Sequence, residues 1–362
     1  ALDSAVASLR GLNGELRGLT ALLSMAIASY RDTDNSVLDL IGSAIATPFE
    51  AAARFPGAVV DGTAALFDEG GVAALQTFVT DDPALIDATV QVVGFAAPPV
   101  DAAMLRLLAD GYFADGSPVV TSRGLDTRPD ATRPPRSLAG LMAGLQLRNS
   151  GEGGEVDVKI LDGPSGRRHV VVDIPGTKDW TPAHESADVT GWASNIRAIE
   201  GTPTTYEKGV LQAMQQAGVQ RTDDVMVVGH SLGGMVAVAL ARDAVRSRRF
   251  NVTHVVTAGS PIGKFVGQLP AGVQVLALEN RHDVVPHLDA KQNPDLPNVT
   301  TATFDLDNGT VGDDHGIDTS YEPGAAEVDA SDDAAIRAFV EGAGGYFGAS
   351  SVHTHRYVIT RE

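Results

Sequence analysis

The amino-acid sequence predicts an α/β fold with a mostly parallel central sheet flanked by helices, preceded by an N-terminal all-helical region. Three observations support this prediction. Short apolar runs rich in β-branched residues alternate with helical patterns in the later part of the chain. The earlier part instead carries apolar residues at three- and four-residue steps. Finally, one strand pattern leads through a glycine-flanked turn directly into a helix pattern.

The first 114 residues are expected to be helical. Apolar residues recur on one face over residues 1–31, which indicates one long first helix. Prolines separate the helical patterns that come after it. These patterns cover residues 37–54, 58–68, 70–80, 83–95 and 99–113.

The remainder divides into a connecting segment and an α/β domain. Residues 115–137 are rich in Pro, Gly, Ser, Thr and charge, which favours a linker or long loop. The domain then covers residues 138–362. A short helix is expected at 137–146, strands at 155–161, 168–174, 225–229, 252–258, 273–278 and 357–360, and helices at 206–217, 232–246 and 331–346.

Composition excludes several classes of protein. The formal net charge of −19 argues against nucleic acid and anionic membrane surfaces as partners. The chain has 0 cysteines, which excludes a cysteine nucleophile, disulfides and thiolate metal sites. No apolar stretch is long enough for a transmembrane segment. We expect no metal and no cofactor, because the acidic loop near Asp305 lacks calcium-loop spacing and no phosphate-binding motif occurs.

Residues 225–233 form the most specific pattern in the chain. The apolar run Val225–Val228 is typical of a buried parallel strand. Gly229-His-Ser-Leu-Gly233 matches the G-x-S-x-G turn, which lifts a serine hydroxyl clear of the sheet. The following helix directs its first N–H groups at any oxyanion that forms there. The pattern therefore predicts Ser231 as the nucleophile of an acyl transfer.

A serine nucleophile needs a base and an orienting carboxylate, which follow it in the order Asp, His after a turn of this kind. Asp283 comes directly after the apolar strand pattern 273–278, at the edge where catalytic acids lie in such sheets. For the base we favour His315, in a polar, glycine-containing loop before the final long helix. His353 and His355, in a polar segment before the terminal strand, stay open as alternatives.

The oxyanion formed by acyl transfer needs two backbone N–H donors. One is expected from Leu232, the residue after the nucleophile. The strand pattern at 168–174 breaks into Pro175-Gly176-Thr177, where glycine permits close backbone approach. We expect Thr177 to supply the second donor, with a simple Pro-Gly turn as the alternative.

Residues 150–320 resemble the class 3 lipase family of the α/β-hydrolases. The similarity rests on Gly-His-Ser-Leu-Gly-Gly at 229–234, Gly176-Thr177, Asp179-Trp180 and Asn280-Arg-His-Asp283-Val-Val-Pro286. Pro175 replaces the usual arginine, and the separation of Asp283 from His315 is short. The resemblance implies an α/β-hydrolase fold and a triad of Ser231, Asp283 and a later histidine.

The first 35 residues weakly resemble actinobacterial type VII secretion substrates, through Tyr30-Arg-Asp-Thr-Asp34 at the end of a helix. The Trp-x-Gly turn of that family is absent. The resemblance implies a secretion-machinery or helical partner for residues 1–35, and favours a secreted or cell-envelope location over a cytoplasmic one. A core-packing helix or a lid over the active site is the alternative.

Together these observations predict a cofactor-free serine esterase or lipase acting on a small-molecule or lipid ester. Two alternatives remain open. The same triad could serve a phospholipase, thioesterase or peptidase, because one fold hosts many acyl transfers. The protein could also be an exported, partner-binding cargo with secondary or lost hydrolase activity.

Overall fold

The computed structural model describes residues 115–163, 166–178, 187–199, 201–283, 285–289 and 291–362. Contacts divide the chain into two compact units, Ala1–Leu105 and Arg106–Glu362. The expected N-terminal helices and the Tyr30–Asp34 segment lie outside the described residues, as do Asp179 and Trp180. All of the described residues belong to the second unit.

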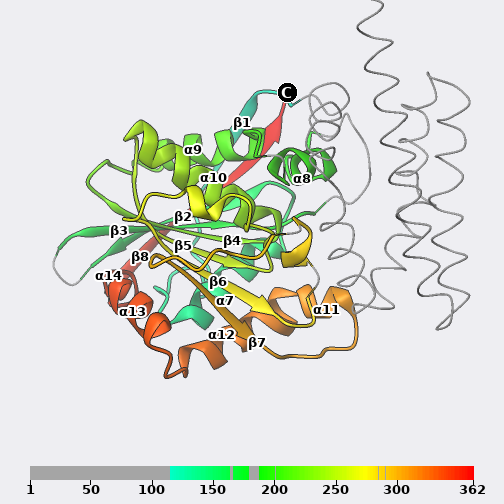
Figure 1. The fold of residues 1–362 in the computed structure, drawn as a ribbon. Helices are drawn as coiled ribbons and strands as arrows, with labels where there is room; N and C mark the ends of the chain where they lie inside the picture. Colours follow the sequence, from blue (N-terminus) through cyan, green and yellow to red (C-terminus); the bar gives the residue numbers. More distant parts are fainter. Residues whose placement is uncertain (1–114, 164–165, 179–186, 200, 284, 290) are drawn as a thin grey trace, which may run out of the picture. The chain divides into compact units, whose positions relative to one another are not determined.

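An eight-stranded sheet forms the centre of this unit, in the order β1-β8-β2-β3-β4-β5-β6-β7 (Figure 1). Strands β3 to β7 run parallel, whereas β1, β8, β2 and β3 pair antiparallel. The strands are β1 (Pro118–Leu125), β2 (Glu155–Asp162), β3 (Arg168–Ile174), β4 (Asp224–His230), β5 (Asn251–Ala258), β6 (Gln274–Asn280), β7 (Val299–Phe304) and β8 (Ser351–Arg361). The predicted α/β fold with a mostly parallel sheet is confirmed.

Helices cover both faces of the sheet (Figure 1). The α-helices are α7 (Leu138–Asn149), α8 (Trp192–Ile199), α9 (Thr205–Gln216), α10 (Leu232–Ser247), α11 (Val311–His315), α12 (Glu322–Asp329), α13 (Ala334–Gly342) and α14 (Gly344–Phe347). Short turns η1 (Val266–Gln268) and η2 (Val285–His287) and the π-helical η3 (Ile317–Tyr321) complete the described elements. One apolar core includes α9 and α10, and the other includes α7, α12 and α13.

Strand alternation explains why the central strands read as continuous apolar runs. In β4, Val225 and Val227 pack into the α9–α10 core, whereas Met226 and Val228 pack into the opposite core. All four are 0% exposed. Because successive side chains point to opposite faces, a strand covered on both sides must be apolar throughout. The strand that leads to Ser231 is thus held rigidly on both faces.

The sequence prediction is wrong for part of the connecting segment at 115–137, because β1 occupies residues 118–125. This strand pairs with β8 over most of its length, yet most of its side chains are exposed. Because the side chains of this strand are not buried, they need not be apolar, and its sequence shows no alternation of apolar and polar residues. The terminal strand is also longer than expected, since β8 begins at Ser351 and takes in His353 and His355.

The segment around His315 is helical rather than a loop. Thr310 caps the N-terminus of α11, because its hydroxyl accepts a hydrogen bond from the Asp313 N–H at 3.1 Å. The final long helix is divided into α13 and α14 at residue 343. A Cβ on Gly345 would lie 2.2 Å from His169 Nε2, so the backbone approaches a side chain of β3 more closely than other residues permit.

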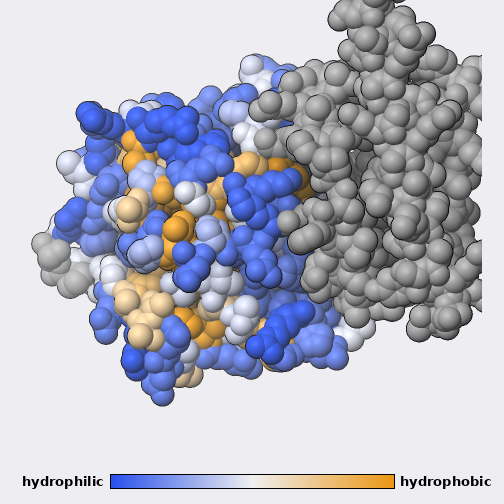
Figure 2. Space-filling model, in the orientation of Figure 1, coloured by the Kyte–Doolittle hydropathy of each residue, from blue (hydrophilic) through white to orange (hydrophobic). Residues whose placement is uncertain are grey.

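The surface of this unit agrees with its acidic composition. Hydrophilic side chains cover most of the face seen in Figure 2. Within the described ranges, the large apolar side chains that are exposed are Val119, Leu125, Leu288 and Leu296. No helix in this described part is long and apolar enough to cross a membrane.

Candidate active site

Ser231 occupies a sharp turn between β4 and α10. Its backbone has φ 54° and ψ −123°, an uncommon conformation for a residue with a side chain. The Ser231 N–H donates to the Ala258 carbonyl at 2.9 Å, so β-pairing with β5 continues to this residue. Leu232 then begins the helix. The turn is the strand–elbow–helix arrangement that the sequence predicted.

Two glycines permit this turn because other backbone segments press against it. A Cβ on Gly229 would lie 2.2 Å from the Gly233 carbonyl oxygen. A Cβ on Gly233 would lie 1.9 Å from the carbonyl oxygen of Ile174, at the end of β3. Any side chain at either position would force these segments apart.

Asp283 and His315 are in direct contact. The Nδ1 atom of His315 lies 2.7 Å from Asp283 Oδ2. The other carboxylate oxygen, Oδ1, accepts the Val285 N–H at 2.9 Å. Asp283 is 1% exposed, so this hydrogen bond is largely shielded from water. Among the residues that the structure describes, none forms a hydrogen bond with His315 Nε2.

The carboxyl ends of parallel strands bring these groups to one edge of the sheet. Ser231 follows β4, Asp283 follows β6, and His315 follows β7 on α11. Gly259, directly after β5, has φ +59°, and a Cβ there would lie 2.8 Å from Asp283 Oδ2 and 2.9 Å from His315 Nδ1. The backbone after β5 therefore packs closely against the acid–imidazole pair.

The Pro175-Gly176-Thr177 turn lies against the serine, as the sequence led us to expect for an oxyanion turn. A Cβ on Gly176 would be 2.9 Å from Ser231 Cβ. Asn195 of α8 donates from Nδ2 to the Thr177 hydroxyl oxygen at 2.8 Å, which orients the turn. A further contact joins the Tyr206 hydroxyl to the Pro175 carbonyl at 3.3 Å. Sequence reasoning did not identify Asn195 or Tyr206, because no local pattern marks either of them.

His230, directly before the serine, links the elbow to the histidine segment. Its Nε2 lies 2.8 Å from the His315 carbonyl oxygen, so Nε2 carries the proton and donates it. The two imidazole rings are 4.4 Å apart between centroids. Burial lowers the pKa of His230 well below 6.5, so the ring is neutral. His230 therefore hydrogen-bonds the backbone of His315 and does not occupy the Nε2 atom of the His315 ring.

Four other histidines of the described residues have different surroundings. His353 and His355 are on β8, which β2 and β3 separate from β4. His254 Nδ1 bonds the Thr253 hydroxyl at 2.9 Å, and burial lowers the pKa of His254 to about 4. His282 Nε2 lies 2.8 Å from Asp305 Oδ1. Of these later histidines, His315 is thus the one in contact with Asp283.

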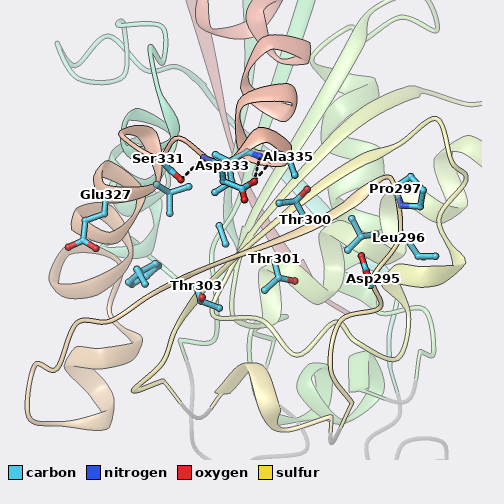
Figure 3. A pocket seen from close by; sticks show the side chains of 15 residues that line it. Asp295, Leu296, Pro297, Thr300, Thr301, Thr303, Glu327, Ser331, Asp333 and Ala335 are labelled. Atoms are coloured by element: carbon cyan, nitrogen blue, oxygen red, sulfur yellow. Dashed lines mark hydrogen bonds between the residues drawn. The ribbon is translucent and has the colours of Figure 1, made fainter.

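A cavity of about 880 Å³ lies along the edge strand β7, away from these residues (Figure 3). Its walls come from β7, with Thr300, Thr301 and Thr303, and from the α12–α13 connection. Asp333 faces it but is already engaged, since it accepts the Ala335 N–H at 2.8 Å as the α13 cap. Ser231, Asp283 and His315 do not line this cavity. No group of three or more metal-binding side chains occurs in the described part of the chain.

The sheet, its flanking helices and the serine elbow together define an α/β-hydrolase. A family model of the alpha/beta hydrolase family matches residues 155–346, and the chain belongs to this family. It is also similar to two solved structures of an esterase from the archaeon Pyrobaculum calidifontis. The monoclinic form is 13% identical, with 72% of this chain and 95% of that chain covered and a TM-score of 0.26. The second, described as a hyperthermophilic esterase, is 12% identical, with 74% and 96% covered and a TM-score of 0.25.

Similarity at these TM-scores carries no argument about activity. No curated protein matches the chain. Membership of the family therefore rests on the family match and agrees with the sheet order and the elbow, whereas reaction and substrate have to be argued from the side chains.

Proposed function

We propose that this protein is a serine hydrolase that cleaves carboxylic esters through Ser231, His315 and Asp283. One observation carries the proposal: His315 Nδ1 lies 2.7 Å from Asp283 Oδ2. Both residues follow the carboxyl ends of parallel strands, as does Ser231 in its turn. An imidazole oriented at Nδ1 by a buried carboxylate keeps Nε2 available as a base. The His315 Nε2 atom has no competing hydrogen bond among the described residues.

The reaction would proceed in two steps. The Ser231 hydroxyl oxygen attacks the ester carbonyl carbon while its proton passes to His315 Nε2. The N–H groups of Leu232 and Thr177 hold the oxyanion, and each such donor contributes about 3 kcal/mol of transition-state stabilisation. Collapse of the tetrahedral species breaks the bond to the alcohol, which takes the proton from Nε2. Water, deprotonated by His315, then releases the acid from Ser231.

Asp283 would keep its charge throughout and stabilise the imidazolium formed in each step. Because only the neutral imidazole accepts the serine proton, turnover should rise as the pH is raised from acid to neutral. A profile that is flat from acid to neutral pH would contradict this mechanism.

The resemblance of residues 150–320 to class 3 lipases favours a lipid or small-molecule ester as substrate. The test is hydrolysis of p-nitrophenyl esters from acetate to palmitate, with a fluorophosphonate label located by mass spectrometry. We expect turnover with the label on Ser231, both lost in Ser231→Ala. Ser247→Ala, at the far end of α10, is the matched control and should keep both.

The outcomes separate the alternatives. Labelling of Ser231 without turnover of simple esters would favour a phospholipase, thioesterase or peptidase, to be tested with those substrates. If the parent protein shows neither turnover nor labelling, the proposal is refuted. In that case a partner-binding role for the chain would become the leading hypothesis.

A further inference from the structure

Tyr321 places its hydroxyl on the same carboxylate oxygen that His315 uses. The Tyr321 O–H donates to Asp283 Oδ2 at 2.5 Å, and His315 Nδ1 lies 2.7 Å from that oxygen. With the Val285 N–H on Oδ1, Asp283 has three hydrogen-bond donors around it. A bond of this length to a carboxylate is typical of a strong, charge-assisted hydrogen bond.

We propose that Tyr321 is a positioning residue, which acts through Asp283 and sets the pH at which His315 becomes an effective base. The inference rests on the proposed function and adds a fourth side chain to the triad. Tyr321 touches neither the nucleophile nor the oxyanion turn in any described contact. Its ring also lies edge-on to the His315 ring, with centroids 6.4 Å apart, and Tyr321→Phe keeps that ring, so the effect of the hydroxyl would pass through the carboxylate.

The packing of Tyr321 keeps the hydroxyl in place. Tyr321 is 0% exposed and ends η3, six residues after His315. Its ring packs edge-on against Phe304 of β7 and against His230, with centroids 5.5 and 5.8 Å apart. The hydroxyl oxygen also lies 3.5 Å from the backbone nitrogen of Asn280, so its own proton is directed at Asp283. Burial and the Asp283 charge raise the pKa of Tyr321 well above 10, so it remains a neutral donor.

Sharing Oδ2 between two donors has a definite electrostatic consequence. The tyrosine hydroxyl stabilises the carboxylate charge, which lowers the attraction of that charge for a proton on the imidazole. Without the hydroxyl, Asp283 favours the protonated imidazole more strongly, and the neutral base becomes available only at higher pH. The hydroxyl therefore extends activity toward lower pH.

Other charged groups around the pair would remain as they are. The neutral His230 faces His315 from the end of β4, and the charge of Lys178 interacts with His230. The charge of Glu279, on β6, interacts with both Asp283 and Tyr321. His287 and Asp289 in turn interact electrostatically with Glu279. Replacing tyrosine by phenylalanine changes none of these groups, so a shift in the pH profile would report on the hydroxyl.

The test compares Tyr321→Phe with Tyr346→Phe. Tyr346 is the matched control because it is also buried, and its hydroxyl bonds the Thr253 hydroxyl at 2.7 Å, remote from Asp283. The measurement is kcat/KM against pH with a p-nitrophenyl ester. We expect the acid limb of Tyr321→Phe to move to higher pH by about half a unit to one unit. Tyr346→Phe should keep the parental midpoint, and equal midpoints in all three proteins would overturn the proposal.

A second readout does not depend on turnover. The proton between His315 Nδ1 and Asp283 gives a downfield NMR resonance, identified by its loss in His315→Gln. We expect it to move in Tyr321→Phe and to stay in place in Tyr346→Phe. If the parent neither turns over esters nor accepts the fluorophosphonate, the proposed function fails, and this resonance still tests the Tyr321 contact. An unmoved resonance in Tyr321→Phe refutes it.

Discussion

Asn280 offers the sharpest test of how the candidate site is held together. It ends β6, is 1% exposed, and joins the segment that carries Asp283 to the one that carries His315. Its Nδ2 donates to the Leu306 carbonyl at 2.8 Å, the Ser320 hydroxyl at 2.9 Å and the Asp314 carbonyl at 3.3 Å. Its Oδ1 accepts the Leu306 N–H at 3.1 Å.

The substitution Asn280→Ala removes all of these contacts. Three of them are short, and a buried hydrogen bond contributes about 1 kcal/mol to stability, so the loss should be about 3 kcal/mol. The segments on either side would then be free to separate. Because a misplacement of catalytic groups by about 1 Å costs up to about 100-fold in rate, we expect kcat to fall between 10- and 100-fold.

The matched control is Asn298→Ala. Asn298 is also buried, but its Nδ2 has one short bond, to the Val273 carbonyl at 2.9 Å. Both residues directly precede a strand, β7 and β6, at the opposite end from Asp283. Urea unfolding should show a loss of about 1 kcal/mol. Its kcat per active molecule, counted by fluorophosphonate titration, should equal that of the parent. Parental kcat in Asn280→Ala, or an equal fall in both variants, would refute the idea that Asn280 aligns Asp283 with His315.

Three further predictions concern single side chains. Asp283→Asn should lower kcat by about 10⁴-fold at neutral pH, measured with the short-chain ester, because an amide favours the wrong imidazole tautomer. Gly259→Ala should lower kcat without abolishing the fold, since its Cβ would lie 2.9 Å from His315 Nδ1; a parental rate would contradict that packing. Burial raises the pKa of Glu207 to about 7, so this carboxyl destabilises the fold increasingly as pH rises from about 4.5 to 7. Glu207→Gln should therefore be more stable than the parent at pH 8, by about 2–3 kcal/mol in urea unfolding, and the difference should shrink at pH 5.

Local sequence patterns predicted the parts of the site that local chemistry determines. The elbow could be recognised because a strand, a tight turn and a helix follow one another within a short segment, and because glycines are required where backbones meet. The position of Asp283 followed from its place after a buried strand, since carboxyl ends of parallel strands share one edge. Both expectations agree with the arrangement found, in which Asp283 also contacts His315.

The sequence misled us where structure depends on distant partners. Strand β1 has mostly exposed side chains, so it forms through backbone bonds to β8, more than 200 residues later in the chain. The His315 segment looked like a loop because its polar residues cap a helix of five residues, too short to show periodicity. Neither feature leaves an apolar pattern in its own segment.

The sequence by itself therefore determined the fold class and the identity of the candidate nucleophile and acid. Both depend on residues close together in the chain, namely the apolar residues of a buried strand and the glycines of the turn after it. Only the tertiary structure decided which histidine meets Asp283, that Tyr321 contacts the same carboxylate, and that Asn280 contacts the residue before His315. These contacts join the ends of separate strands. They depend on how the strands are ordered in the sheet, and no spacing along the chain encodes that order.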